Sequence, residues 1–110
     1  MLTFFCYKMY FIYVLYSETA DMHYVGYTTD ITQRLHKHNN QEHFNTFTRK
    51  HRPWILSALF SCGESESEAI KLERFIKKQK SKSLIEKLVD EEFHPTGSLA
   101  QLVRVPHVRD

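Results

Sequence analysis

The sequence predicts one domain of mixed α/β architecture, of the α+β class, in which a small three-stranded antiparallel β-sheet is flanked by about three helices. Three observations support this. Two apolar, aromatic-rich runs are separated by a short polar turn, a third apolar run begins at Trp54, and segments with helical periodicity lie between and after these runs. The 110 residues, 42% hydrophobic and 14% aromatic, suffice for one packed core.

The first two strands are predicted to form a hairpin. Residues 10–16 are continuously apolar and rich in aromatic and β-branched side chains, which is typical of a strand covered on both faces. The polar turn 17–21 returns the chain into a second strand at 22–27. Gly26 lies inside that strand and indicates a bulge or a close approach by another group, because glycine otherwise weakens a strand. Residues 54–62 are predicted to be the third strand.

A first helix is expected over about residues 31–38, after the capping residues Thr28, Thr29 and Asp30. The polar segment that follows it, up to Pro53, has no sustained period and is predicted to be a loop.

Two further helices are expected after the third strand. The first of them is capped by Ser65 or Ser67 and runs to about Gln79, and the next starts at Ser81 or Ser83. Each carries an apolar stripe at helical spacing, so each should pack on the sheet.

We expect the domain to span residues 9–92, preceded by an N-terminal extension at 1–8. Residues 93–110 are punctuated by proline and glycine and lack a period, so they are predicted to form a partly ordered C-terminal tail. Removal of residues 1–8 and 96–110 should then leave the melting temperature nearly unchanged.

Charge and cysteine content narrow the class of protein. The net charge of +2 is only mildly basic, but six of the twelve residues from Lys71 to Lys82 are Lys or Arg, and residues 49–52 form a second basic cluster. These clusters are either solvated faces or nucleic-acid contacts.

Cys6 and Cys62 have no disulfide-framework or zinc spacing, so a reducing, cytoplasmic setting is expected. No membrane association is expected, because the apolar N-terminal run is too short to span a bilayer.

Several polar side chains fall where chemistry could be performed. Arg34 and His38 are i and i+4 neighbours on one side of the first helix, and Glu73 lies within an apolar stripe of the second. A carboxylate in such a stripe is costly unless it meets a cation, a basic partner such as Arg34 or Lys77, or a wet cleft. Tyr13 and Tyr24 lie on paired strands, where their alternative role is core packing.

A zinc site built from the seven histidines is disfavoured. His36 and His38 point about 200° apart on a helix and cannot both bind one ion. His38 could equally be a satisfied, partly buried histidine, and Arg34 could be solvated or salt-bridged.

The combined pattern resembles the GIY-YIG nuclease superfamily, in particular its small single-domain branch. Its elements are the tripeptides Phe11-Ile12-Tyr13 and Tyr24-Val25-Gly26, and then Thr28, Arg34, His38 and Glu73. The loop residues Thr48, Arg49, Pro53 and Trp54 also fit that branch. Two departures are present. Phe11 replaces the first motif glycine, and no Asn follows Glu73, which bears on the catalytic rate more than on the fold.

The resemblance implies a catalytic set and a cofactor. The catalytic residues would be Tyr13, Tyr24, Arg34, His38 and Glu73, with Glu73 as the ligand of one divalent ion, Mg²⁺ or Mn²⁺. Arg34 would bind the non-bridging phosphate oxygens. Tyr13 would act near the attacking water, and Tyr24 and His38 would position phosphate or relay a proton.

Further contacts to the substrate are expected at the edges of this set. They are Thr28, Arg49, Lys50, Arg52 and Lys77.

The function expected from these residues is a divalent-metal-dependent DNA endonuclease that hydrolyses phosphodiester bonds in duplex or branched DNA. DNA repair is one setting for such an activity, and a protein partner could supply specificity. Two alternatives stay open: a catalytically weak or inactive nucleic-acid-binding module with the same fold, and a protein-interaction module that uses the acidic patches at 64–68 and 90–92.

Overall fold

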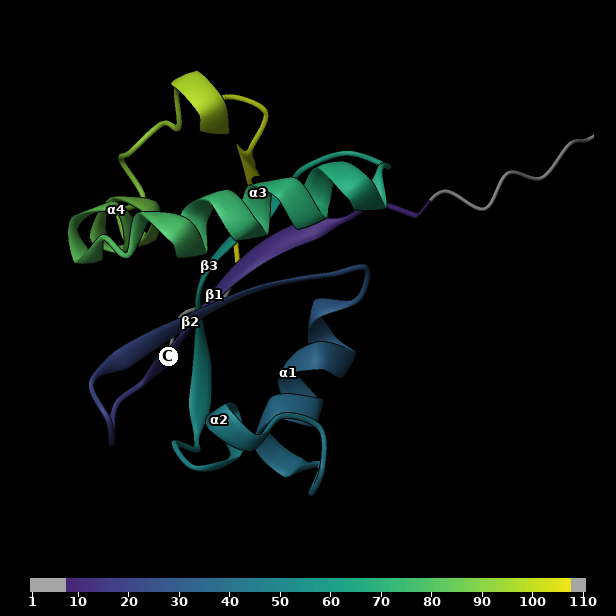
Figure 1. Ribbon diagram of the computed structural model, residues 1–110, viewed down its shortest axis with the longest axis vertical. Helices are drawn as coiled ribbons and strands as arrows, with labels where there is room; N and C mark the ends of the chain where they lie inside the picture. The colour runs from purple at the N-terminus through teal and green to yellow at the C-terminus, as the bar shows by residue number, and fades with distance from the viewer. Residues whose placement is uncertain (1–7, 108–110) are drawn as a thin grey trace, which may run out of the picture.

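The computed structural model describes residues 8–107 (Figure 1). Along the chain its elements are β1 (Phe11–Ser17), β2 (Met22–Thr28), α1 (Ile31–Asn40), α2 (Thr46–Arg49), β3 (Trp54–Ser61), α3 (Glu66–Gln79), α4 (Lys82–Val89), the 3-10 helix η1 (Gly97–Leu99) and β4 (Val103–Arg104).

The sheet is antiparallel and has the strand order β2-β1-β3-β4. The predicted α+β class and the three predicted strands are confirmed, and the short β4 is an addition at the far edge. In the β1–β2 hairpin Tyr13 lies opposite Gly26, and Leu15 opposite Tyr24. Because side chains alternate between faces along a strand, Tyr13 and Tyr24 lie on the same face of the sheet.

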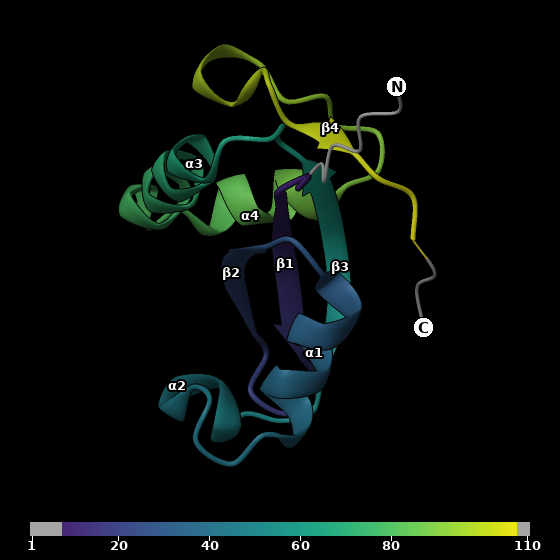
Figure 2. The ribbon, with the colours of Figure 1, turned by 90° about the vertical axis from the view of Figure 1, so that its right-hand side faces the viewer.

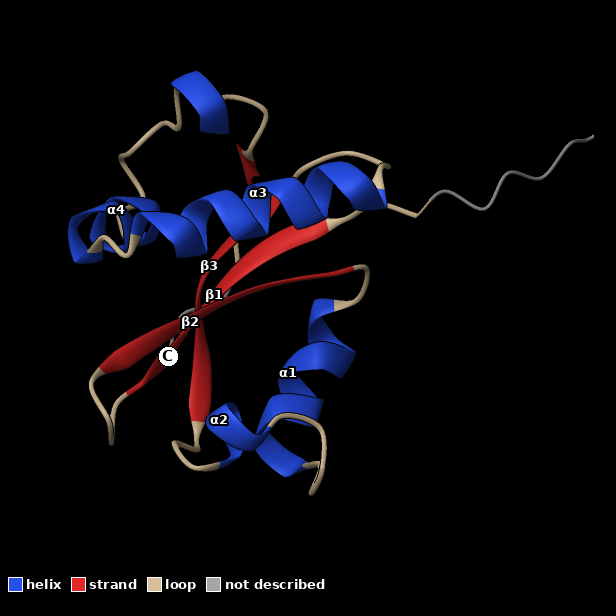
Figure 3. Ribbon diagram, in the orientation of Figure 1, coloured by secondary structure: helices blue, strands red, loops and turns tan. Residues whose placement is uncertain are grey.

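Helices cover the two faces of the sheet separately, as Figures 1 and 3 show for α3 and α4 on one side and α1 and α2 on the other. The α3/α4 side holds the larger core cluster, with Ile12, Val14 and Phe60 of the sheet fully buried. Around Tyr13, Leu15 and Trp54 a smaller cluster fills the α1 side. β2 is an edge strand against which α3 packs, whereas α1 packs against β3 on the opposite face of the sheet (Figure 2).

Local capping explains where the helices start. Asp30 accepts the Gln33 amide at the start of α1, and the Ser65 and Ser81 hydroxyls accept the Glu68 and Leu84 amides in α3 and α4. Of the alternative caps considered above, Ser65 and Ser81 are therefore the ones used. The short helix α2 was not predicted. It begins where the Asn45 side chain accepts the Thr48 amide.

The segment after residue 92 packs on the body of the domain, which differs from the expectation of a tail outside the core. Leu99 and Leu102 are 5% and 4% exposed and belong to the larger core cluster. Arg104 donates to the carbonyls of Leu88 and Asp90, and β4 extends the sheet beside β3. The burial of these leucines argues against the expectation that residues 96–110 are dispensable, which stays a prediction, and residues 1–7 and 108–110 lie outside the described part.

Candidate active site

The residues singled out from the sequence converge at the β2 edge of the sheet. β1 and β2 supply Tyr13 and Tyr24, α1 supplies Arg34 and His38, and α3 supplies Glu73. The charges of Arg34 and Glu73 both act on the pKa of Tyr13, which Arg34 lowers and Glu73 raises. The site thus joins residues from both faces across one edge strand.

Gly26 makes room for the Tyr13 ring. A Cβ atom at Gly26 would lie 2.9 Å from Cε2 of Tyr13 and closer still to its Cζ and hydroxyl. Ordinary carbon–carbon contact begins near 3.5 Å. The close approach that the sequence indicated at Gly26 is therefore confirmed, and its partner is the tyrosine directly across the hairpin.

A buried chain of hydrogen bonds fixes the Tyr13 hydroxyl. Its oxygen is 2.8 Å from Nε2 of His38, and Nδ1 of His38 is 2.9 Å from Oγ1 of Thr48. The Thr48 hydroxyl donates to the Asn45 carbonyl at 3.4 Å, so its oxygen is left to accept the proton of Nδ1. Nε2 then carries a lone pair, and Tyr13 donates its proton to His38.

Burial keeps both partners of this bond neutral. The pKa of Tyr13 is raised, mainly by burial and further by neighbouring Tyr24, although the charge of Arg34 opposes the rise. The pKa of His38 is lowered to about 4, first by burial and then by the cations of Arg34, Arg52 and Lys77. At neutral pH His38 is therefore an uncharged acceptor.

Arg34 is half-buried, and its guanidinium acts on the Tyr13 hydroxyl. Its Nη1 donates to the Tyr27 carbonyl at 3.3 Å, and its Cζ lies 5.3 Å from the Phe44 ring centroid. No carboxylate within residues 8–107 forms an ion pair with it. A half-buried arginine held by one carbonyl and an aromatic face retains donors that suit two oxygens of a phosphate.

Glu73 lies on α3 with a side chain that is 19% exposed. Its Oε1 is 3.1 Å from Nζ of Lys77, one turn later, and this Nζ lies 4.7 Å from the Tyr24 ring centroid. Of the two partners considered from sequence, Lys77 rather than Arg34 forms the ion pair. Within the described chain Oε2 of Glu73 has no hydrogen-bond partner, so one carboxylate oxygen is left to bind a ligand.

The donor set fits a hard divalent ion that keeps most of its water. Among residues 8–107 no three His, Cys, Asp or Glu side chains are grouped to enclose a metal. Mg²⁺ is commonly held by one or two carboxylates together with waters and substrate phosphate oxygens, and Mn²⁺ also accepts oxygen ligands. Glu73 can supply that single carboxylate through Oε2.

The expected substrate contacts divide into two groups. Thr28 is buried, with its hydroxyl donating to the Asp30 carbonyl and accepting the Asp30 amide, so it shapes the start of α1. Arg52 donates to the carbonyls of His38 and Gln41 and closes the end of α1. Both side chains are thus engaged inside the protein.

The other three expected contacts are available to solvent. Arg49 forms only an exposed pair with Glu42, worth at most about 1 kcal/mol, which a phosphate could replace. Lys50 is exposed, and Lys77 borders the site beside Tyr24.

Sequence reasoning missed the residues that orient the others. Thr48 sets the His38 tautomer, Asn45 donates to the Tyr24 hydroxyl at 3.2 Å, and Phe44 lies under Arg34. Thr48 was noted only as part of a loop motif. Asn45, ahead of two threonines, is the recognisable signal of a helix cap in that loop.

Comparison with protein families agrees with this geometry. The model of the GIY-YIG catalytic domain matches residues 9–87, so the chain belongs to the GIY-YIG nuclease family. Nucleases of this family act on nucleic acid and typically use a divalent metal ion. A search of curated proteins found no match. Within residues 8–107, none of the helices has both the length and the apolar character that a membrane crossing requires.

Proposed function

We propose that this protein is a divalent-metal-dependent DNA endonuclease that hydrolyses phosphodiester bonds. The observation that carries this is the convergence of a directed Tyr13–His38–Thr48 hydrogen-bond chain, the open Arg34 fork and the Glu73 carboxylate at one sheet edge. These groups meet the three needs of phosphodiester hydrolysis: a positioned nucleophile, stabilisation of charge on the phosphate, and support for the leaving oxygen.

Arg34 binds the non-bridging oxygens of the scissile phosphate, while its contacts to Tyr27 and Phe44 hold the guanidinium in place. The Tyr24 hydroxyl accepts a hydrogen bond from the side-chain amide of Asn45, so its own proton is free to be donated to a phosphate oxygen. Glu73 would hold the ion, which when bound would stabilise charge on the phosphate and the departing oxygen.

Tyr13 takes a proton from the attacking water while its own proton passes to Nε2 of His38. The tyrosine then ends neutral, and an imidazolium forms. In the free protein burial, and after it the cations around His38, oppose this transfer, because together they lower the pKa of His38 to about 4. A bound phosphate brings negative charge beside Arg34 and offsets that effect, so the relay is favoured when substrate is present.

A plasmid-nicking assay with Mg²⁺, Mn²⁺ or excess EDTA tests the assignment. The wild type should nick in either metal and not in EDTA, whereas Glu73→Gln should be inactive and keep its fold. Glu68→Gln is the matched control, because Glu68 lies on the same helix and pairs only with exposed Lys71. Nicking by Glu73→Gln at the wild-type rate would remove the metal centre from the mechanism.

The Glu73–Lys77 ion pair favours one alternative, a binding module with weak or no turnover. The amine lies 3.1 Å from Oε1, beside the Oε2 atom that the ion needs, and would repel a nearby cation. Lys77→Gln separates the two possibilities. If the pair limits metal binding, this variant should need less Mn²⁺ for half-maximal cleavage, and if the site is inactive neither protein should nick.

We further propose duplex or branched DNA as substrate, a protein partner that supplies specificity, and a role in DNA repair in a cytoplasmic, reducing setting. The buried free thiol of Cys62 is compatible with such a setting. Cleavage of a panel of duplex, single-stranded, flap and branched DNAs tests the substrate class.

A further inference from the structure

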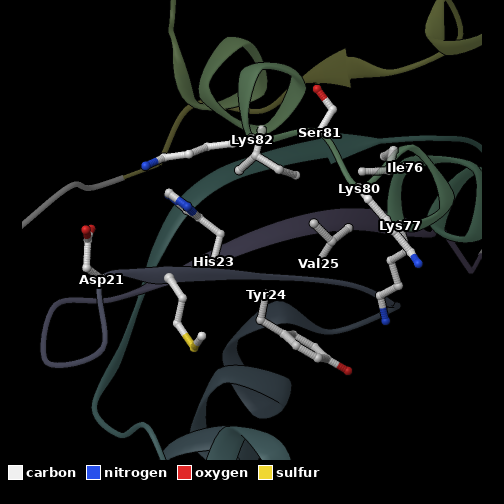
Figure 4. Close-up of a pocket in the computed structure, with 11 residues that line it drawn as sticks. Asp21, His23, Tyr24, Val25, Ile76, Lys77, Lys80, Ser81 and Lys82 are labelled. Carbon is white, nitrogen blue, oxygen red and sulfur yellow. The ribbon is translucent and has the colours of Figure 1, made fainter.

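A groove of about 400 Å³ runs along the outer side of β2, between this strand and the junction of α3 with α4. Its floor is apolar and includes Val25, Ile76 and Ile85, and three lysines line it: Lys77, Lys80 and Lys82. Figure 4 shows Lys77 and Lys80 on the side of the Tyr24 hydroxyl and Lys82 reaching toward His23. The groove therefore begins at the candidate active site.

Two of these lysines occupy positions that the backbone disfavours. Lys80 ends α3 with φ of 47°, in the left-handed region where glycine is preferred. Lys82 is the first residue of α4 after its Ser81 cap, where the positive end of the helix dipole repels a cation. Lys77 lies in the last turn of α3, where the helix dipole stabilises a cation, but no such effect stabilises Lys82. We therefore look for a function of the Lys80 and Lys82 side chains.

The charge of the groove is not neutralised from within the described chain. Lys80 and Lys82 have no acidic partner within ion-pair distance there, whereas Lys77 is shared with Glu73. Apart from Glu73, the negative groups lie at the far end, where Asp21 accepts the Tyr16 hydroxyl and where Asp21, Glu86 and Lys82 all act on His23. Lys77 and Lys80 thus carry positive charge along α3 away from Glu73, and Lys82 on α4 extends it to His23, where the acidic groups begin.

We propose that this groove binds the phosphate backbone of the DNA strand on one side of the scissile bond, with Lys80 and Lys82 as phosphate contacts. This inference rests on the nuclease function proposed above and adds a binding site to it. From Glu73 to Lys80 the helix rises about 10 Å, at 1.5 Å per residue, which equals about three base-pair steps along the axis of duplex DNA. The apolar floor suits the sugar faces between phosphates.

DNA affinity of Lys80→Gln/Lys82→Gln tests the proposal against a matched control, Lys78→Gln/Lys87→Gln. The control removes the same charge from exposed lysines of α3 and α4 that do not line the groove. Binding of a labelled duplex is measured without metal over a range of KCl concentrations. Two lost contacts should lower the slope of log affinity on log salt by about 1.8 and weaken binding about 30-fold at 0.15 M salt. The control should change the slope by less than half as much.

A second measurement uses DNA shortened one nucleotide at a time on either side of the cleaved bond, with Mn²⁺ present. The wild type should lose rate on one side once fewer than about three nucleotides remain, and the groove variant should be insensitive to that shortening.

The outcomes separate this inference from the nuclease assignment. If DNA binding depends on Lys80 and Lys82 but no DNA is cleaved, the groove proposal is supported and the nuclease assignment is rejected. Cleavage with equal affinities for the groove variant and its control overturns the groove and leaves the nuclease intact. The groove proposal is also contradicted if the wild-type protein does not bind DNA, or if the lysine substitutions affect only the binding of a protein partner.

Discussion

Substitution of Gly26 by alanine should misplace the Tyr13 hydroxyl and slow cleavage, although Gly26 carries no functional group. The new Cβ would lie 2.9 Å from Cε2 of Tyr13, so this atom must move by at least about 0.6 Å to reach ordinary contact, and the hydroxyl end must move further. Tyr13 is 1% exposed, so the ring cannot swing into solvent. The 2.8 Å bond to His38 would break or pull His38 away from Thr48.

Displacements of about 1 Å near reacting atoms cost up to about 10²-fold in rate. We therefore expect Gly26→Ala to cleave 10- to 100-fold more slowly under single-turnover conditions and to lose about 1–3 kcal/mol of stability, as for an overpacked core. Circular dichroism and urea unfolding establish how much of the sample is folded, so that the rate refers to folded protein.

The double variant Tyr13→Phe/Gly26→Ala is the internal control. Ring carbons Cζ and Cε2 remain in the phenylalanine, so the Cβ should still cost stability, but with no hydroxyl left to misplace, cleavage should fall little below that of Tyr13→Phe alone. Additive losses in cleavage rate in the double variant would mean that Gly26 acts through something other than the Tyr13 hydroxyl. A Gly26→Ala protein with wild-type cleavage would refute the requirement for a fixed Tyr13 hydroxyl.

Three further outcomes are expected. Arg34→Ala should lower cleavage by about 10²-fold or more and DNA affinity by less, and equal losses would make Arg34 a general phosphate contact. Because the pKa of His38 falls from 6.5 unfolded to about 4 folded, the unfolded chain gains a proton first, and stability should decline between about pH 6.5 and pH 4 by up to about 3 kcal/mol. That part of the decline should be missing in urea unfolding of His38→Gln and kept in exposed His36→Gln. Leu99→Ala should cost about 2–5 kcal/mol, whereas Val103→Ala, at a position 62% exposed, should cost little.

Local signals in the sequence were sufficient for most of the fold. The hairpin follows from two apolar runs and a polar turn, and the helix starts follow from Asp30, Ser65 and Ser81, because a cap acts on amides two or three residues away. The position of Glu73 on an apolar stripe likewise correctly indicated a partly buried carboxylate.

What the sequence could not reveal depends on contacts between distant residues. Arg52 resembled a phosphate contact within a basic cluster, but its donors end on carbonyls at the end of α1, 11 to 15 residues away. Leu99 and Leu102 stand in a segment without helical or strand periodicity, so their burial depends on η1 and β4 folding back onto the sheet. Spacing along the chain cannot distinguish such a segment from a solvated tail.

The edge position of β2 explains both the site and its neighbouring groove. A central strand would be covered on both sides by other strands, and groups from α1 on one face could not meet groups from α3 on the other. At the edge, Arg34 and Glu73 can both act on Tyr13 around a single strand. The same position leaves the outer side of β2 open, and an open strand edge invites pairing with other chains unless charge discourages it. Lys80 and Lys82 beside that edge would therefore have two roles, because their charges discourage pairing with another β-strand and also attract the phosphates of DNA.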